Sequence, residues 1–74
     1  MKYMIGENVK GYKQNNNLSI RGTSRTMKVN YKTINELVNE KVNTVRLETA
    51  YNISRFFNIS IDDLLFKNIF NNKN

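Results

Sequence analysis

The sequence predicts an all-α fold built from five short helices. Apolar residues recur at helical spacing in five separate stretches, and residues suited to cap a helix precede several of them. No proline occurs among the 74 residues and the three glycines do not cluster, so nothing marks a linker between domains. We therefore expect a single domain over residues 1–74, with an ordered core from about residue 5 to about residue 70.

The first two helices differ in how well their residues favour helix. Ile5, Val9 and Tyr12 recur at helical spacing, which predicts a helix over Ile5–Asn15. The three asparagines that close this stretch favour a turn. The second helix is expected over Ile20–Met27, where glycine, serine and threonine are poor helix formers, so packing must hold it.

The third helix is expected over Tyr31–Asn39 and shows a polar face to solvent. Asn30 precedes it and Ser19 precedes the second helix, and each offers a side-chain oxygen to the unpaired N–H groups at a helix start. Ile34 and Leu37 are three positions apart and therefore point the same way, toward the core. The polar side chains between them are left outside.

Two further helices complete the fold. A polar connection leads to a fourth helix that begins at Thr44 or Val45 and ends at Asn58. Ser60 caps a fifth helix, whose apolar residues extend as far as Phe70. The residues expected to form the core are Ile5, Val9, Leu18, Met27, Val29, Ile34, Leu37, Leu47, Ile53, Phe57, Ile61 and Leu64.

The positive charge of the chain is confined to its first half. The net charge is +6, and residues 1–35 hold seven basic residues and one acidic residue, whereas residues 36–74 hold five of each. A one-sided positive field suits a polyanion, since neutralising phosphates releases counterions. The alternative is an ordinary solvated basic surface, and charge alone carries no information about sequence specificity.

Several classes of function are disfavoured by what the sequence lacks. Without cysteine or histidine, the commonest zinc ligands and the commonest general base are missing. Asp62 and Asp63 adjoin a helix cap and do not face each other across a cleft, so we expect no enzymatic activity, no metal and no cofactor. No segment resembles a signal peptide or approaches the length of a membrane span. We expect a cytoplasmic protein with no membrane partner and no small-molecule ligand.

Several stretches together resemble one known family. They are Ile5–Lys10, Asn17–Ser19, Val29–Asn30 with Thr33, Ile34 and Leu37, Leu47–Thr49, Ile53–Ser54 and Asn58–Leu65. In this order and spacing they resemble the phage Cro/repressor-like helix-turn-helix family, the lambda-repressor-like DNA-binding domains. The resemblance implies a compact five-helix domain in which the second helix lies across the DNA backbone and the third enters the major groove.

The resemblance also implies two sets of DNA-contacting residues. The base-reading positions are Tyr31, Lys32, Thr33, Asn35 and Glu36. The phosphate-contacting positions are Ser19, Arg21, Lys28, Asn39, Lys41 and Arg46. Lys32 can donate to guanine, Asn35 can pair with adenine N6 and N7, and Glu36 can accept from cytosine N4. As alternatives, each cation is a solvated charge, Tyr31 leans onto the apolar seam, and Glu36 pairs with Lys32.

The second helix and its flanks depart from the family pattern. The family usually has glutamine near the start of this helix, where this chain has Ile20, so an expected contact to the DNA backbone is lost. In place of the usual apolar residue and alanine, it has Thr23 and Ser24. Ser24 is still small enough for close approach of the third helix. Lys28 and Glu40 stand where glycine is common, and a lysine held at positive φ costs about 1 kcal/mol.

The function expected from these features is sequence-specific binding of double-stranded DNA by a transcriptional regulator, acting as a repressor. The alternative is a protein-interaction module of the same fold, antitoxin-like or an anti-regulator, with weak or no specific DNA binding. Phe66, Ile69 and Phe70 are too many apolar residues for one helix face. We expect them to form a homodimer interface that sets two reading helices about 34 Å apart on a palindromic operator. The alternative is that they fold back against the first helix.

Overall fold

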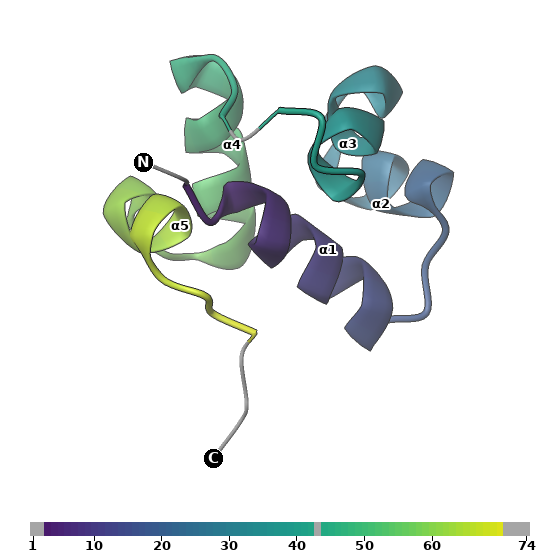
Figure 1. Ribbon diagram of the computed structural model, residues 1–74, viewed down its shortest axis with the longest axis horizontal. Helices are drawn as coiled ribbons and strands as arrows, with labels where there is room; N and C mark the ends of the chain where they lie inside the picture. Colours follow the sequence, from purple (N-terminus) through teal and green to yellow (C-terminus); the bar gives the residue numbers. More distant parts are fainter. Residues whose placement is uncertain (1–2, 43, 71–74) are drawn as a thin grey trace.

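Five α-helices occupy the part of the chain that the computed structural model describes, residues 3–42 and 44–70. They are α1 (Ile5–Asn15), α2 (Ile20–Met27), α3 (Tyr31–Val38), α4 (Leu47–Phe57) and α5 (Ile61–Phe66) (Figure 1). No strand occurs in these two ranges, and the predicted all-α, five-helix fold is confirmed. No helix within them is long and apolar enough to cross a membrane.

The side-chain caps predicted from the sequence define three of the helix starts. Ser19 and Ser60 each accept a hydrogen bond from the backbone N–H three residues on, at 2.9 and 3.0 Å. Asn30 accepts from the backbone N–H of Lys32 at 2.8 Å. Thr23, fully buried where the family has an apolar residue, donates its hydroxyl to the Ser19 carbonyl at 2.9 Å. Its polar group is therefore satisfied inside α2, which keeps a weak helix former in place.

Two helix boundaries near the middle of the chain differ from the prediction. α3 ends at Val38, because Asn39 acts as its C-cap with φ −91° and ψ 9°. The predicted start of α4 at Thr44 or Val45 is wrong, because Arg46 keeps extended backbone, with φ −62° and ψ 152°, and the helix begins after it. The connection from α3 to α4 is correspondingly longer than expected.

The core lies where all five helices meet. Its buried apolar residues are Ile5, Val9, Met27, Val29, Ile34, Leu37, Val38, Ala50, Ile53 and Leu64. Phe57 packs against this cluster, while Leu18 and Ile61 are only half-buried. The prediction that Leu47 is a core residue is wrong, because its side chain is 73% exposed at the first position of α4. Val45, in the connection before it, packs against the core instead.

α1 crosses the molecule between the α2–α3 pair and the α4–α5 pair (Figure 1). It packs against both α3 and α5, and α2 packs against α3. A Cβ atom added at Gly6 would lie 2.9 Å from the carbonyl oxygen of Leu37, so α1 and the end of α3 approach each other closely at a glycine. α3 is thus held from two sides, and its remaining side is free to meet a ligand.

After α5, residues 67–70 leave the helix and lie against α1. Lys67 has φ −120° and ψ 145°, which ends α5 at Phe66, so the expected continuation of the helix to Phe70 is wrong. Asn8, fully buried in α1, donates from Nδ2 to the carbonyls of Leu64 and Lys67, both at 2.8 Å. Its Oδ1 accepts from the N–H of Ile69 at 2.9 Å. One buried asparagine therefore bonds to three backbone groups at the end of α5 and just after it.

Of the three residues predicted at a dimer interface, two follow the alternative. Phe70 packs edge-on against Tyr12 and Phe57, with ring centroids 6.3 and 5.5 Å apart. Ile69 is half-buried beside α1. Both residues therefore fold back against the first helix. Phe66 remains 50% exposed and touches the fold through an edge-on contact with Tyr3 at 5.6 Å.

Candidate nucleic-acid interface

The connection between α2 and α3 is a tight turn closed by hydrogen bonds. Lys28 adopts the left-handed conformation, with φ 60° and ψ 42°. The N–H of Val29 donates to the carbonyl of Ser24 at 3.1 Å, and the Ser24 hydroxyl donates to the carbonyl of Val29. The small side chain at Ser24 therefore helps to close the turn. The geometry for which glycine is best suited is kept with a lysine.

α3 has one buried face and one face open to solvent. Ile34 and Leu37 are fully buried and Val38 is 9% exposed, which holds the helix against its neighbours. The remaining side chains of the helix are those predicted to read bases, namely Tyr31, Lys32, Thr33, Asn35 and Glu36. Tyr31 and Lys32 are exposed and the other three are half-buried. Ile34 and Leu37 lie on the inner face as predicted, and Val38 joins them there.

A groove of about 470 Å³ lies between α3 and the connection to α4. Lys32, Thr33 and Glu36 line it from α3, and Arg46 and Thr49 line it from the start of α4. The structure therefore brings a predicted phosphate contact, Arg46, together with three predicted base readers. Two cations, three threonine hydroxyls and one carboxylate line it, which are groups that contact DNA phosphates and base edges.

Tyr31, the first of the predicted base readers, contacts a residue of α2. The guanidinium of Arg21 lies over the ring of Tyr31, 5.1 Å from its centroid. Tyr31 is 45% exposed, so it stacks on a cation at the surface and does not enter the core. This contact places a predicted phosphate contact of α2 directly beside the first residue of α3.

Asn35 and Asn39 form a pair at the C-terminal end of α3. Asn39 Nδ2 donates to the backbone carbonyl of Asn35 at 3.0 Å and to its Oδ1 at 2.8 Å. A residue predicted to contact phosphate thus contacts a residue predicted to read a base. Their spacing of four residues is a signal that the sequence contains.

The other predicted phosphate contacts are exposed but have separate surroundings. The Ser19 hydroxyl is engaged as the N-cap of α2. Lys28 lies beside Asn52 and Arg55 of α4, in a hollow that no other predicted DNA-contacting residue lines. Lys41 follows α3 and borders a cavity against α1. The structure groups Arg21, Asn39 and Arg46 with base readers, and it does not group Lys28 with them.

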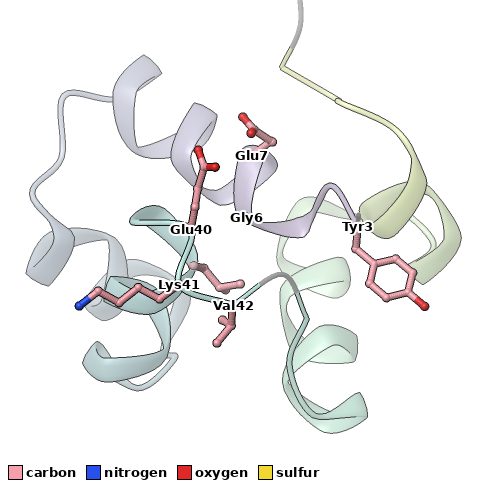
Figure 2. Close-up of a pocket in the computed structure, with 7 residues that line it drawn as sticks. Tyr3, Gly6, Glu7, Glu40, Lys41 and Val42 are labelled. Atoms are coloured by element: carbon pink, nitrogen blue, oxygen red, sulfur yellow. The ribbon is translucent and has the colours of Figure 1, made fainter. Parts of the chain in front are cut away.

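The negative charge at Glu40 is directed toward α1. Glu40 has φ 57° and its carboxylate lies 3.9 Å from the ammonium of Lys10. Figure 2 shows it on the rim of a cavity of about 320 Å³, with Glu7 on the same side and Lys41 extending away. The Glu40 carboxylate therefore lies within ion-pair distance of a cation of α1.

Three polar residues of the groove, Asn30, Thr44 and Thr49, were not among the predicted DNA contacts. Asn30 lines the groove besides capping α3, and Thr49 lines it from the first turn of α4. Thr49 lies in one of the stretches that resemble the family, but only the fold brings it opposite Lys32 and Thr33. Residues on different helices carry no common spacing by which to find them.

The comparisons agree with this geometry. A family model described as a Cro/C1-type HTH DNA-binding domain matches residues 12–66, a range that contains α2, the turn, α3, α4 and α5. Searches of curated proteins and of solved structures give no significant match. The family model covers most of the chain and includes the helix-turn-helix and the groove beside it. The chain therefore belongs to the family of Cro/C1-type helix-turn-helix DNA-binding domains, a non-catalytic family.

Proposed function

We propose that this protein is a sequence-specific, double-stranded DNA-binding transcriptional regulator, acting in the cytoplasm as a repressor. The observation that carries the proposal is the outer face of α3, which presents five side chains with hydrogen-bonding groups while Ile34 and Leu37 anchor the helix. A helix with such a face fits the major groove, where each base pair has its own pattern of donors and acceptors. Occupying an operator is sufficient to exclude other proteins from it.

The surrounding cations supply affinity in this proposal. Arg21 stands at one end of α3, above Tyr31, and Arg46 stands across the groove from Lys32. Lys41 is exposed just after the helix. Contacts to phosphate from these positions orient the protein on the duplex without selecting a sequence. Base contacts from α3 then select the operator.

Selection of bound sites from a random DNA pool tests the proposal. The wild-type protein is expected to enrich one motif, and a palindrome within it indicates binding as a dimer. Lys32→Ala is expected to relax the preference at one position, worth roughly 1–3 kcal/mol of discrimination. Arg21→Ala and Lys41→Ala are expected to weaken binding to all sequences and to lower the salt slope by about one unit each.

Lys67→Ala is the matched control for the phosphate contacts. Lys67 lies after α5 and pairs with Asp63 at 3.3 Å, so its removal is expected to leave both affinity and salt slope unchanged. A pool that enriches nothing would contradict the proposal.

The second candidate is a protein-interaction module of the same fold. Ile20 replaces the polar residue that usually begins α2, and Glu36 places a carboxylate in the groove. Both features weaken contacts to a phosphate backbone. Binding to DNA with a negligible salt slope, together with no enriched motif, would favour this function over the first.

A further inference from the structure

The pair formed by Asn35 and Asn39 fixes the orientation of a side chain that faces DNA. Asn39 Nδ2 donates both to the backbone carbonyl of Asn35 and to its side-chain Oδ1, at 3.0 and 2.8 Å. A carbonyl oxygen only accepts, so the atom of Asn39 that faces it has to be the amino nitrogen. The orientation of the Asn39 amide is thereby set by the backbone.

The orientation of Asn35 follows from that of Asn39. The amino group of Asn39 also faces the Asn35 amide, and a bond forms only if Asn35 turns its oxygen toward it. The reversed amide would oppose two donors and lose the bond. Because oxygen and nitrogen lie on opposite sides of the amide carbon, the Asn35 amino group faces away from Asn39.

We propose that Asn39 is a specificity-determining positioning residue, which makes Asn35 present its amino group to the major groove. This inference rests on the proposed function. Asn35 then selects a base edge that accepts hydrogen bonds, as guanine does with O6 and N7 and thymine does with O4. Adenine also offers an acceptor at N7, and the second lone pair of the Asn35 oxygen leaves the two-bond pairing with adenine available, whereas cytosine offers only an amino group and is disfavoured.

The structure also separates this role from a phosphate contact. The Asn39 amino group is engaged within α3, whereas a phosphate oxygen needs that same donor. Substitution of Asn39 is therefore expected to change the base preference at one operator position and not to weaken binding to all sequences equally.

Site selection with a set of variants tests the proposal. Asn35→Ala is expected to abolish the discrimination against cytosine at one operator position, which in the wild-type protein is expected to be about tenfold. Asn39→Ala frees the Asn35 amide to turn its oxygen outward, so the same position is expected to accept cytosine as well. Asn39→Asp removes the donor, and its carboxylate is repelled by the backbone carbonyl of Asn35, so this variant is expected to lose the wild-type preference as Asn39→Ala does.

Asn16→Ala is the matched control. Asn16 ends α1 as Asn39 ends α3, and its Nδ2 donates to the carbonyl four residues earlier, that of Tyr12, at 2.9 Å. Its loss costs the same kind of helix-end bond without touching a base reader, so the operator preference is expected to be unchanged. Circular dichroism of each variant verifies that the fold is retained.

Base analogues give a second readout. If the selected base is guanine, replacing its N7 by carbon is expected to weaken wild-type binding and to leave Asn35→Ala binding unaffected. Variants at Asn39 that keep the wild-type preference, or that weaken every sequence equally, would overturn the inference while leaving the proposed function intact. A wild-type protein that selects no motif would instead refute the proposed function.

Discussion

At the scale of single residues, Tyr31 links the two helices of the helix-turn-helix through its ring. The Arg21 guanidinium lies over that ring at 5.1 Å, and a surface contact of this kind is worth about 0.5–1 kcal/mol. Tyr31→Leu is expected to release Arg21 and to weaken binding to any DNA about two- to fivefold. Tyr31→Phe keeps the ring and is expected to keep this part of the affinity. Fluorescence anisotropy with nonspecific DNA measures both.

Tyr51 and Arg55 of α4 provide a control for this prediction. Arg55 lies 5.7 Å from the centroid of the Tyr51 ring and donates to its hydroxyl at 3.2 Å. The pair has the same chemistry on another helix. Tyr51→Leu is expected to leave DNA affinity unchanged. Equal losses from the two leucine variants would show that the contact at Tyr31 has no special role.

Asn8 is the residue on which the C-terminal segment most depends. It is fully buried and bonded to backbone groups of Leu64, Lys67 and Ile69. Asn8→Ala is expected to lower the free energy of unfolding by about 2–4 kcal/mol, because buried backbone groups lose their partners. Asn8→Asp is expected to lower the free energy of unfolding at least as much, because a carboxylate cannot donate to the two carbonyls. Urea unfolding measures the loss, and an unchanged midpoint would contradict this assignment.

At the scale of helices and turns, left-handed residues join the elements. Among described residues, Asn17, Lys28, Glu40 and Asn58 have φ between 52° and 60°, and none is glycine. Asparagine tolerates this conformation, whereas lysine and glutamate do so at a cost of about 1–2 kcal/mol. The turns therefore keep their shape at the expense of stability, and the packing of α3 against α1 and α2 compensates.

Glycine at these turns is expected to stabilise the fold. Lys28→Gly and Glu40→Gly are each expected to raise the free energy of unfolding by up to about 1 kcal/mol, because relief of strain exceeds the added entropy of the unfolded chain. Thr26→Gly, at an exposed position inside α2, is the control and is expected to destabilise the fold by a few tenths of a kcal/mol. Thermal unfolding followed by circular dichroism measures all three. A loss of stability in Lys28→Gly would indicate that the lysine side chain contributes more than its backbone costs.

The same elements show what a sequence can predict. Ser19, Asn30 and Ser60 mark helix starts because a cap is a local signal carried by one side chain. α4 begins after Arg46, which makes no side-chain cap, so its start carries no such signal. α5 ends early because Asn8, far away in sequence, holds the segment after it. Of the boundaries predicted wrongly, the end of α5 depends on a contact between distant residues, whereas the start of α4 lacks a local cap signal.

The candidate site divides in the same way. The outer face of α3 follows from its periodicity alone, since Ile34 and Leu37 define the inner face. The contact of Arg21 with Tyr31 joins two helices, and the meeting of Arg46 with Lys32 crosses a groove. Neither follows from spacing along the chain. Contacts that position one side chain against another are therefore set by the fold and cannot be predicted from the sequence.

At the scale of the whole molecule, charge and apolar surface are separated along the chain. The excess of positive charge lies in residues 1–35, which include α1, α2 and the start of α3. Residues 36–74 are neutral in sum, and Phe66 near the end of α5 is half exposed. A charged half suits a polyanion, and a neutral half with an exposed aromatic ring suits contact with another protein chain.

A homodimer formed through Phe66 is the last prediction. Wild-type protein is expected to sediment as a dimer at micromolar concentration, and Phe66→Ser is expected to be a folded monomer that binds half an operator more weakly. Phe70→Ser is the control, because Phe70 packs against Tyr12 and Phe57 within its own chain, so this variant is expected to lose stability and to keep self-association while folded. One α3 contacts only a few base pairs. A dimer contacts twice as many, which lets the protein distinguish its operator from the many similar sequences in a genome. A wild-type protein that stays monomeric on and off DNA would remove the dimer and require α3 alone to supply specificity.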